Sequence, residues 1–463
     1  MTKKNFLHQN RRHCYLFPLK GGEGRQMKSY RMKFIVGLLL VLCFCPLKAL
    51  AFEKLTPKVS QNPFYYLKSD YAMPLLSKDE QNNRASGAKD RFFLPWSGDF
   101  RHSKDDLLWP FNAYLPGKVY GENERPREKR WFDEIYSKAH IEAFKDINAP
   151  GITIAEGSLR AFPTHDPIFL SPELPGEGYP FDYGQVSRVN PGEPIRISHF
   201  SRDNSFAYVE TSFAAGWIDS RKIAYVNEGF IDRYMPLPLA VIVKDDKVVS
   251  KGNLFIFNVK IGSLFPLNEE LLYDLELLVP TGKDEAGLAT LEAVRLPRDF
   301  AKRWPIEFSQ WNAASLIDEM MGETYGWGGM YGKRDCSATT RDFFLPFGIW
   351  LPRNSSAQAK SGTFISLEGL TPLQKEKTII EAGTPFASIL YKPGHVMLYA
   401  GSYRGRVVVF HNLWGLRTKS KGVEGRYVIG RSVLSTLDVG KDLPGIDPDG
   451  LLINAITGMT NLL

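Results

Sequence analysis

The middle of the chain restricts the possible folds most, because it consists of short segments in which apolar and polar residues alternate. Segments 195–198 and 205–210 show this alternation, and similar segments continue as far as Val279. Gly, Pro, Asn or Asp bounds each segment, which is typical of antiparallel strands in small barrels. We therefore predict two successive small β-barrels, over residues 157–227 and 228–296.

The N-terminus has the layout of a secretory signal. Lys28 and Arg31 precede an almost wholly apolar stretch, 34–47, and an Ala-Leu-Ala sequence ends at Ala51. We place a signal peptide at about 32–51, with cleavage after Ala51. The apolar stretch is shorter than the roughly 20 residues of a membrane-spanning helix, so we expect no stable membrane insertion after cleavage. The mature protein is expected to be exported, either to the periplasm or as a secreted protein.

Removal of the leader, residues 1–51, changes both the charge and the cysteine content. The full chain has a formal net charge of +7, and loss of the basic leader brings the mature chain close to neutrality. The basic balance is therefore no evidence for nucleic-acid binding, and we expect no nucleic-acid partner. Cys14, Cys43 and Cys45 are lost with the leader. A lipid anchor at Cys45 is a poor alternative because the bulky Phe44 precedes it.

Cys336 is the only cysteine that remains after this cleavage. It follows a glycine-rich run, 325–335, and the next helix is expected to begin at Cys336 and to stop by Pro346. A thiol at the start of a helix lies at the positive end of the dipole, which favours thiolate over thiol. A lone cysteine is more often a small buried apolar residue than a nucleophile. The nucleophile hypothesis therefore depends on the neighbours of this residue.

Two histidines on a predicted hairpin supply the base that a cysteine nucleophile needs. His395 begins one expected strand, and His411 lies near the end of the next. A hairpin register centred on Tyr403 places the two imidazoles opposite one another on the same face. One ring can accept the proton of Cys336 while the other orients it. The sequence thus predicts a triad of Cys336, His395 and His411.

The other histidines give no metal-binding pattern. The sequence contains no His-Glu-x-x-His motif and no two cysteine pairs, and the remaining histidines of the mature chain are scattered: His102, His140, His165 and His199. The glycine-rich run lacks the Lys-Ser/Thr that completes a phosphate-binding P-loop. We therefore expect neither a metal ion nor a cofactor.

Two further regions flank the barrels. Prolines interrupt residues 52–156 before a helical pattern at 130–145, which predicts a mostly helical or irregular bracing domain. In 297–463, Ser309 is a suitable N-cap for a helix that Gly322 can end. Helices come first in this region and an antiparallel meander follows, which makes the fold class α+β and multidomain. Four apolar residues share one predicted face of the first helix: Trp311, Ala314, Ile317 and Met321.

Five motifs in this order resemble the NlpC/P60 cysteine peptidases of the cell wall. They are Tyr325-x-Trp327-Gly328-Gly329, Asp335-Cys336-Ser337, Pro352-Arg353-Asn354-Ser355, Pro393-Gly394-His395 and His411-Asn412-Leu413-Trp414-Gly415. The segment 207–210, followed by 216–218, is similar to the core of bacterial SH3 domains. The domain order resembles the NlpC/P60 subgroup with an N-terminal bracing domain, two bacterial SH3 (SH3b) domains and a C-terminal catalytic domain.

The resemblance implies a papain-like catalytic domain and a peptidase activity. Cys336 would attack the scissile amide, His395 would act as general base and then general acid, and His411 would orient His395. The implied partners are peptidoglycan stem peptides or murein fragments. The implied bond joins γ-D-glutamate to the diamino acid, diaminopimelate. We expect a monomer.

The resemblance also assigns the substrate-binding residues. In the subgroup, the aspartate before the cysteine pairs with the free amino group of the terminal L-alanine, and Asp335 has that place here. Ser337 and Ser355 are the matching polar contacts. Tyr325 and Trp327 would form walls of the pocket. A requirement for the free amine would restrict the enzyme to stems already detached from glycan.

Two other functions stay open at this point. An acyltransferase or amidase on the same fold would also use a cysteine and a histidine. Asp335 favours a peptide over a lipid substrate, because a carboxylate that recognises an amine has no evident role with a lipid. A non-catalytic wall-binding SH3b protein is the other alternative, and the three occupied triad positions argue against it.

Overall fold

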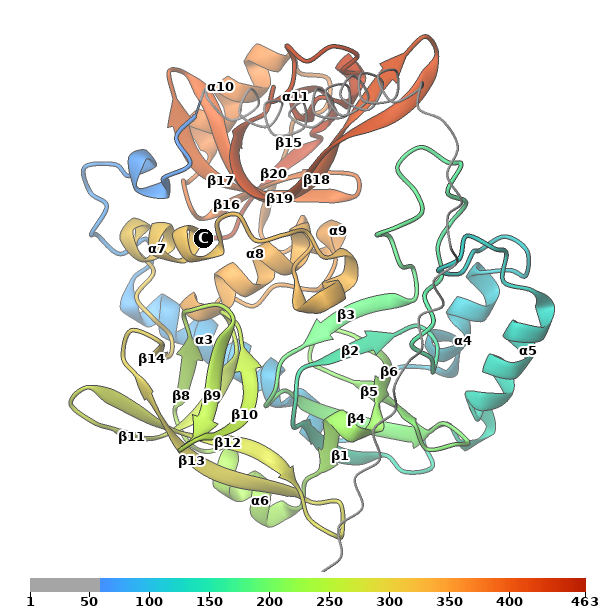
Figure 1. Cartoon of the computed structure of the whole chain (residues 1–463). Coiled ribbons are helices and arrows are strands. Elements are labelled where there is room, and N and C mark those ends of the chain that lie inside the picture. The colour runs from blue at the N-terminus through green and yellow to red at the C-terminus, as the bar shows by residue number, and fades with distance from the viewer. Residues whose placement is uncertain (1–58) are drawn as a thin grey trace, which may run out of the picture. The chain divides into compact units, whose positions relative to one another are not determined.

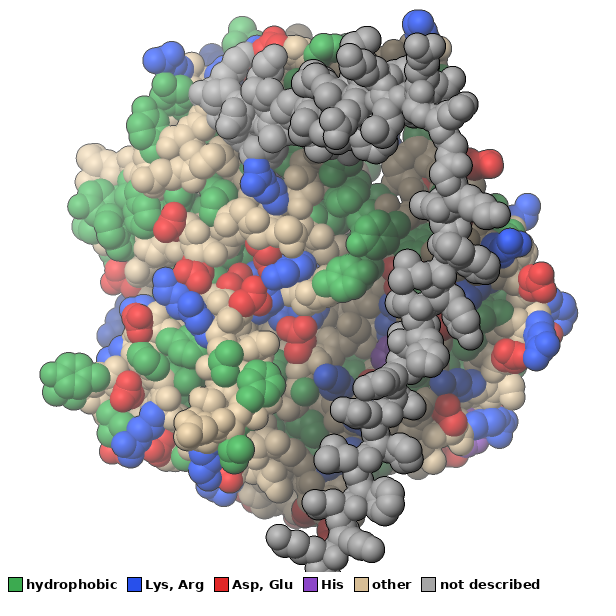
Figure 2. Space-filling model, in the orientation of Figure 1, with side chains coloured by type: hydrophobic (Ala, Val, Ile, Leu, Met, Phe, Trp, Pro, Cys, Tyr) green, Lys and Arg blue, Asp and Glu red, His purple; other side chains and the backbone are tan. Residues whose placement is uncertain are grey.

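The computed structural model describes residues 59–463 (Figure 1). The predicted signal peptide and its cleavage site after Ala51 lie outside the described residues. Within this part of the chain, none of the helices combines the length and the apolar character that crossing a membrane requires. Figure 2 shows acidic and basic side chains interspersed over the face in view.

The N-terminal region is mostly helical, as predicted. Its main helices are α3 (Lys78–Phe93), α4 (Lys104–Ala113) and α5 (Lys129–Lys138). Short 3-10 turns occur at η1 (Pro63–Tyr66), η2 (Leu94–Trp96) and η3 (Ile141–Ala143). Ser77 and Ser103 cap α3 and α4 by accepting hydrogen bonds from backbone N–H groups of the first turn.

The helix predicted at 130–145 is shorter than expected. It ends at Lys138, and His140 then adopts a left-handed backbone conformation with φ of 49°. A residue in this conformation cannot continue an α-helix. The apolar side chain of Ile141 is buried nevertheless, in the turn η3.

The first predicted barrel is a seven-stranded antiparallel sheet in the order β3-β2-β6-β5-β4-β1-β7. Its strands are β1 (Ala149–Thr153), β2 (Gly157–Arg160), β3 (Gln185–Val189), β4 (Pro194–Phe200), β5 (Phe206–Glu210), β6 (Ala215–Asp219) and β7 (Ile223–Tyr225). Ile195, Ile197 and Val209 point into its apolar core, as the alternation predicts. Strand β1 begins before the expected boundary at 157 and pairs with β4 and β7.

The second β unit follows the helix α6 (Glu228–Tyr234). A five-stranded sheet has the order β13-β12-β11-β8-β14, and a hairpin of β10 and β9 accompanies it. The strands are β8 (Leu239–Ile242), β9 (Lys247–Lys251), β10 (Leu254–Val259), β11 (Leu264–Glu270), β12 (Asp274–Lys283), β13 (Ala289–Pro297) and β14 (Ala301–Arg303). Side chains from the sheet and the hairpin, including Ile242, Val249 and Phe265, share one apolar core. A second β unit therefore exists where the sequence predicts one.

The C-terminal region has helices first and a meander afterwards, as predicted. The helices are α7 (Gln310–Met320), α8 (Cys336–Phe344), α9 (Ser355–Gln358), α10 (Pro372–Ala382) and the short α11 (Leu452–Ala455). The sheet has the order β15-β20-β16-β17-β18-β19. Its strands are β15 (Thr363–Ser366), β16 (Ser388–Lys392), β17 (His395–Tyr403), β18 (Arg406–Ser420), β19 (Val423–Thr436) and β20 (Gly458–Asn461). Helix α8 packs against β17 and β18, which brings the two predicted catalytic elements together (Figure 1).

Helix α7 begins after the predicted cap, because the Ser309 side chain accepts a hydrogen bond from the backbone N–H of Asn312. One residue of its predicted apolar face differs from expectation. Trp311 is 49% exposed, and its ring contacts Phe64 and Tyr71 at centroid distances of 4.9 and 5.7 Å. Tertiary contacts with the N-terminal segment, rather than the main core, therefore hold this side chain.

Helix α3 packs against the C-terminal region. Gln81 is buried on this helix, and its Nε2 donates to the carbonyls of Ile306 at 2.6 Å and Phe347 at 2.9 Å. Phe92 and Phe93 of α3 belong to the same apolar core as residues of α8 and β17. The N-terminal region thus shares its core with the catalytic region.

Candidate active site

Cys336 lies at the first position of α8, as predicted. Asp335 is the N-cap, and its Oδ1 accepts a hydrogen bond of 2.8 Å from the backbone N–H of Ala338. The backbone N–H groups of Val396 and Ser337 lie close enough to the sulfur to lower its pKa. Since Val396 follows His395 on β17, this contact places the nucleophile directly beside the predicted base.

The thiol of Cys336 is not activated in this resting structure. Burial is the main cause that raises its pKa, the charge of Asp335 adds to it, and the pKa reaches about 11. The two N–H donors and Arg353 lower the pKa by less than this. The expectation that the helix start favours a thiolate is therefore wrong here, because desolvation outweighs the donors.

The two predicted histidines meet, although the predicted register is wrong. The hairpin turns at Arg404 and Gly405 rather than at Tyr403, so Leu398 pairs with Phe410. His395 and His411 are consequently diagonal neighbours on one face of the sheet, and a diagonal separation is within reach of two rings. Their Nε2 and Nδ1 atoms are 2.8 Å apart.

The histidine pair continues into a third residue that the sequence did not reveal. Nε2 of His411 lies 3.0 Å from Oγ of Ser435 on β19. If His395 donates from Nε2 to Nδ1 of His411, then His411 donates from Nε2 to Ser435, and Nδ1 of His395 is left to accept a proton. Only the pairing of β18 with β19 brings Ser435 to this position.

Both imidazoles are neutral in this environment. Burial, followed by the charges of His411 and Lys392, holds the pKa of His395 well below its ordinary value. Burial alone lowers the pKa of His411 to about 3. The site therefore holds a neutral thiol next to neutral imidazoles.

Asp335 forms a two-point ion pair with Arg353. The guanidinium reaches Oδ2 at 2.6 Å and Oδ1 at 3.1 Å, and its Nε donates to Ser187 Oγ on β3 at 2.8 Å. Burial opposes ionisation of Asp335, but Arg353 and the donors from Ala338 and Ser337 hold its pKa below the ordinary value. Asp335 is thus an ionised carboxylate beside Cys336. Arg353 belongs to a motif seen in the sequence, but its contact with Asp335 depends on the fold.

Tyr325 and Trp327 line a cleft of about 420 Å³ together with His395. Phe181, from the loop before β3, packs edge to face on Trp327 at a centroid distance of 5.2 Å, and Trp414 lies 5.8 Å from Tyr325. Both predicted wall residues thus line the same cleft as His395, the predicted base. Phe181 is also the contribution of the first barrel to this wall.

The other two predicted contacts differ in position. Ser337 donates to Asp335 Oδ1 at 3.2 Å and accepts from Arg353 Nη1 at 2.9 Å. Ser355 begins α9 and is not among the residues that line the cleft.

The glycine pair before Cys336 allows the first barrel to approach closely. Gly328 and Gly329 have φ of 58° and 89° in the turn η5 (Trp327–Gly332). A Cβ on Gly328 would lie 2.5 Å from the carbonyl oxygen of Gln185, and one on Gly329 would lie 2.5 Å from the backbone nitrogen of Arg188. Gln185 Nε2 also donates to the Gly328 carbonyl at 3.1 Å. Glycine is therefore required at both positions by backbone conformation and by space.

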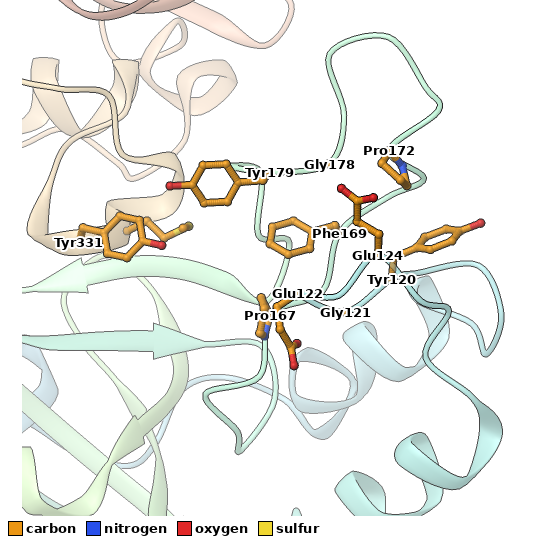
Figure 3. Close-up of a pocket in the computed structure, with 11 residues that line it drawn as sticks. Tyr120, Gly121, Glu122, Glu124, Pro167, Phe169, Pro172, Gly178, Tyr179 and Tyr331 are labelled. Carbon is orange, nitrogen blue, oxygen red and sulfur yellow. The ribbon is translucent and has the colours of Figure 1, made fainter. Parts of the chain in front are cut away.

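A second cavity, of about 270 Å³, lies on the other side of η5. Figure 3 shows the aromatic rings of Phe169, Tyr179 and Tyr331 around it. None of the predicted site residues lines it. Three of the predicted site residues, Tyr325, Trp327 and His395, line the cleft described above instead.

An ion-pair cluster around Arg334 fixes the backbone next to Cys336, the predicted nucleophile. Arg334 is completely buried and contacts Asp342 of α8, Glu323 and, from the second β unit, Asp245. Its own carbonyl accepts from Asn412 Nδ2 at 2.9 Å. The backbone just before Cys336 is thus fixed from several directions. Among residues 59–463, no three His, Cys, Asp or Glu side chains are grouped so that they could hold a metal ion.

Three family models match the chain in the order that the resemblance implies. Residues 34–144 match the N-terminal NLPC_P60 stabilising domain, 167–219 match an SH3 domain of the SH3b1 type, and 322–428 match the NlpC/P60 family. These matches confirm the bracing domain, one SH3b domain and the NlpC/P60 domain. The SH3 identity of the second β unit stays a prediction.

One solved structure agrees with this assignment, and a second shows only a weak likeness. An NlpC/P60 endopeptidase from Photobacterium damselae subsp. piscicida is 24% identical, with a TM-score of 0.77 over 87% of this chain and 97% of that one. An NlpC/P60 family protein from Bacillus cereus ATCC 10987 is 16% identical, with a TM-score of 0.44 over 68% of this chain and 100% of that one. A comparison with the curated proteins gave no match. The chain therefore has the fold of the NlpC/P60 cell-wall hydrolases.

Proposed function

We propose that this protein is a cysteine peptidase that hydrolyses the γ-D-glutamyl–diaminopimelate bond of peptidoglycan stem peptides. The observation that carries the proposal is the contact of the Cys336 sulfur with the N–H of Val396, next to the hydrogen-bonded chain of His395, His411 and Ser435. A nucleophile, a base and a group that orients the base are the three parts that amide hydrolysis by a cysteine needs.

The reaction proceeds through a thioester. As the sulfur of Cys336 attacks the scissile carbonyl carbon, its proton passes to Nδ1 of His395. His411 stabilises the resulting His395 imidazolium, because its Nδ1 accepts a hydrogen bond from Nε2 of His395. His395 then gives this proton to the leaving amine, and the carbon–nitrogen bond breaks. A water molecule, deprotonated by His395, hydrolyses the thioester, and the proton returns to the sulfur.

Because Cys336 and His395 are both neutral in the free enzyme, the thiol proton moves to His395 only when the scissile carbonyl is bound beside the sulfur. A thiol whose pKa is raised to about 11, beside an imidazole of lowered pKa, gains little from transferring its proton in the free enzyme. The developing charge on the substrate must drive the transfer. This protects an exported thiol from reacting with other electrophiles.

Asp335 is proposed to bind the free amino group of the terminal L-alanine. Its carboxylate is ionised, adjoins the nucleophile, and is fixed in orientation by Arg353. Oδ2 has fewer donors than Oδ1, because it accepts only from Arg353 and the N–H of Gly328. The amine is expected to bind at this oxygen. Tyr325 and Trp327 line the cleft, and Ser337 contacts Asp335 and Arg353. Ser355 completes the proposed set.

The wider setting follows from the same proposal. We place the protein outside the cytoplasm, in the periplasm or secreted, as a monomer whose SH3b domain contributes to substrate binding. The proposed partners are peptidoglycan stem peptides and murein fragments.

The test uses the mature chain beginning at residue 52 and the tripeptide L-Ala-γ-D-Glu-diaminopimelate. Mass spectrometry should detect L-Ala-γ-D-Glu, and Cys336→Ala should lower turnover by at least about 10³-fold, since removal of a nucleophile costs this much or more. Lys377→Met, on the exposed face of α10, is the matched control. Absence of cleavage by the unaltered protein, or undiminished cleavage by Cys336→Ala, would contradict the mechanism.

The role of Asp335 needs a second substrate. N-acetylation of the alanine should abolish turnover, because the amide has no charge to pair with the carboxylate. Equal rates on the two peptides would refute this role and leave the nucleophile unaffected. Binding of murein without cleavage would instead support the wall-binding alternative.

A further inference from the structure

The cleft at His395 has a basic side that the proposed mechanism does not use. Beyond the catalytic base it is lined by Lys392 at the end of β16, by Arg417 on β18 and by Arg426 on β19. One acidic residue, Asp449, also lines this side. The cations therefore exceed the carboxylates among the lining side chains.

Lys392 has no carboxylate partner among the described residues. Its ammonium donates only to the carbonyl of the adjacent Pro393, at 3.3 Å, whereas Arg417 is paired with Asp447 at 2.7 Å. Lys392 is half-buried, and burial is the main cause that lowers its pKa. The ionised form of Cys336 would raise this pKa, so the ammonium group lies near the sulfur. A half-buried, unpaired ammonium that faces a cleft is suited to an anionic group of the substrate.

Arg426 provides a second free cation on the same side. Its Nη1 donates to the carbonyl of its own neighbour, Gly425, at 2.9 Å. Its guanidinium lies against Gly176 of the first-barrel loop, where a Cβ would come within 2.6 Å of Nε. Arg417 and Arg426 both lower the pKa of Lys392 by charge repulsion, so the three cationic groups lie near one another.

The chemistry determines which part of a substrate would face these cations. His395 must protonate the leaving amine, so the residue after the scissile bond lies on the side of His395 and not on that of Asp335. Lys392 is separated from His395 only by the tight turn of Pro393 and Gly394. The basic side of the cleft is therefore the leaving-group side.

We infer that Lys392, with Arg426, binds the side-chain carboxylate of the diamino acid that follows the scissile bond, and thereby selects diaminopimelate over lysine. Asp449 faces the same cleft and can receive the ammonium group at the same end of the diaminopimelate side chain. A lysine side chain ends in an ammonium group alone, which the excess of cations would repel. This inference rests on the proposed function and names the residue that the site accepts.

The test compares three tetrapeptides, L-Ala-γ-D-Glu-X-D-Ala, in which X is diaminopimelate, its side-chain amide, or lysine. The D-alanine moves the C-terminal carboxylate away from X, so that only the side chain differs. We expect the unaltered protein to prefer diaminopimelate in kcat/KM by about 10- to 100-fold, as for loss of one charge-assisted hydrogen bond. Lys392→Met should lose this preference because its kcat/KM falls on the diaminopimelate peptide and changes little on the lysine peptide. Lys392→Arg should retain part of the preference.

Two outcomes would overturn the inference. If Lys392→Met lowers kcat/KM equally on all three peptides, the lysine acts on the nucleophile or on the fold and does not recognise the side chain. A variant that retains the preference would show that another group reads the side chain. Lys377→Met again serves as the matched lysine control.

Binding separates this inference from the proposed function. Calorimetry with Cys336→Ala should give tighter binding of the diaminopimelate tetrapeptide than of its amide, and the added Lys392→Met change should remove the difference. If the peptide binds in this way but the unaltered protein does not cut it, the proposed function fails and the carboxylate site stands. If the two peptides bind equally, the site fails whether or not cleavage occurs.

Discussion

Arg334→Met is expected to destabilise the protein by about 3–5 kcal/mol, the usual cost of removing one partner from a buried ion pair. The side chain is 0% exposed, and all five N–H donors of its guanidinium have acceptors. After the substitution, Glu323 would keep Lys260 at 2.9 Å, and Asp342 would keep Arg188 at 3.1 Å. Asp245 would lose both of its guanidinium contacts, so the cost should fall mainly on this one carboxylate.

The assay is urea unfolding followed by tryptophan fluorescence, with Arg303→Met as the control. Arg303 contacts Glu270 at 2.6 Å, but the two side chains are 62% and 34% exposed, so its loss should cost less than about 1 kcal/mol. A double-mutant cycle with Asp245→Asn should give a coupling free energy well above zero. Independent effects of the two changes, or an Arg334→Met protein within about 1 kcal/mol of the parent, would refute the reasoning.

The pH dependence gives a second check on the same variant. Burial opposes ionisation of Asp342, but Arg341 and Arg334 lower its pKa to about 2, and Arg334 also helps to depress the pKa of Asp245. A depressed pKa in the folded state stabilises the protein above the unfolded pKa near 4, and this stabilisation is lost as the pH falls through the folded value. The difference in stability between the parent and Arg334→Met should therefore shrink below about pH 4. A difference that grows on acidification would contradict the assignment.

Two further predictions concern the nucleophile and its loop. Alkylation of Cys336 by iodoacetamide should accelerate with pH beyond pH 9, because burial and then Asp335 raise the thiol pKa to about 11, and a plateau below pH 9 would contradict this. Gly328→Ala should destabilise the protein by about 1–3 kcal/mol, because its Cβ would lie 2.5 Å from the Gln185 carbonyl oxygen. Both the urea midpoint and the turnover should therefore fall. Gly322→Ala is the matched control, since φ is also positive there but no atom lies within 4 Å, and equal effects of the two changes would rule out the close contact as the cause.

The features that the sequence predicted correctly depend on local signals. Ser309 caps a helix that begins one residue later, and the next helix begins at Cys336, both as predicted. The alternating strands of the first barrel bury the expected side chains. These outcomes follow from backbone hydrogen bonding and from the two-residue period of a strand, both of which act over a few positions.

The features that the sequence missed depend on contacts between distant segments. The hairpin register differs from the prediction because Arg404 and Gly405, which both have positive φ, form the turn, whereas the prediction centred it on Tyr403. Arg334 meets Asp245 across 89 positions, and Arg353 meets Ser187 across 166. No local pattern encodes such pairs. Burial of Cys336, which reverses the expected direction of its pKa shift, is likewise a property of the assembled fold.

The first barrel contacts the proposed active site directly. Phe181 packs on Trp327, Gln185 donates to Gly328, and Ser187 accepts from Arg353. Because Arg353 in turn contacts both oxygens of Asp335, the position of β3 helps to fix the orientation of this carboxylate. A displacement of the barrel would therefore change the orientation of Asp335, the proposed substrate-binding residue. The hydrogen bond between His395 and His411 joins two strands of the C-terminal sheet and would be affected less. The contacts of Phe181 and Gln185 occupy the barrel surface that meets η5.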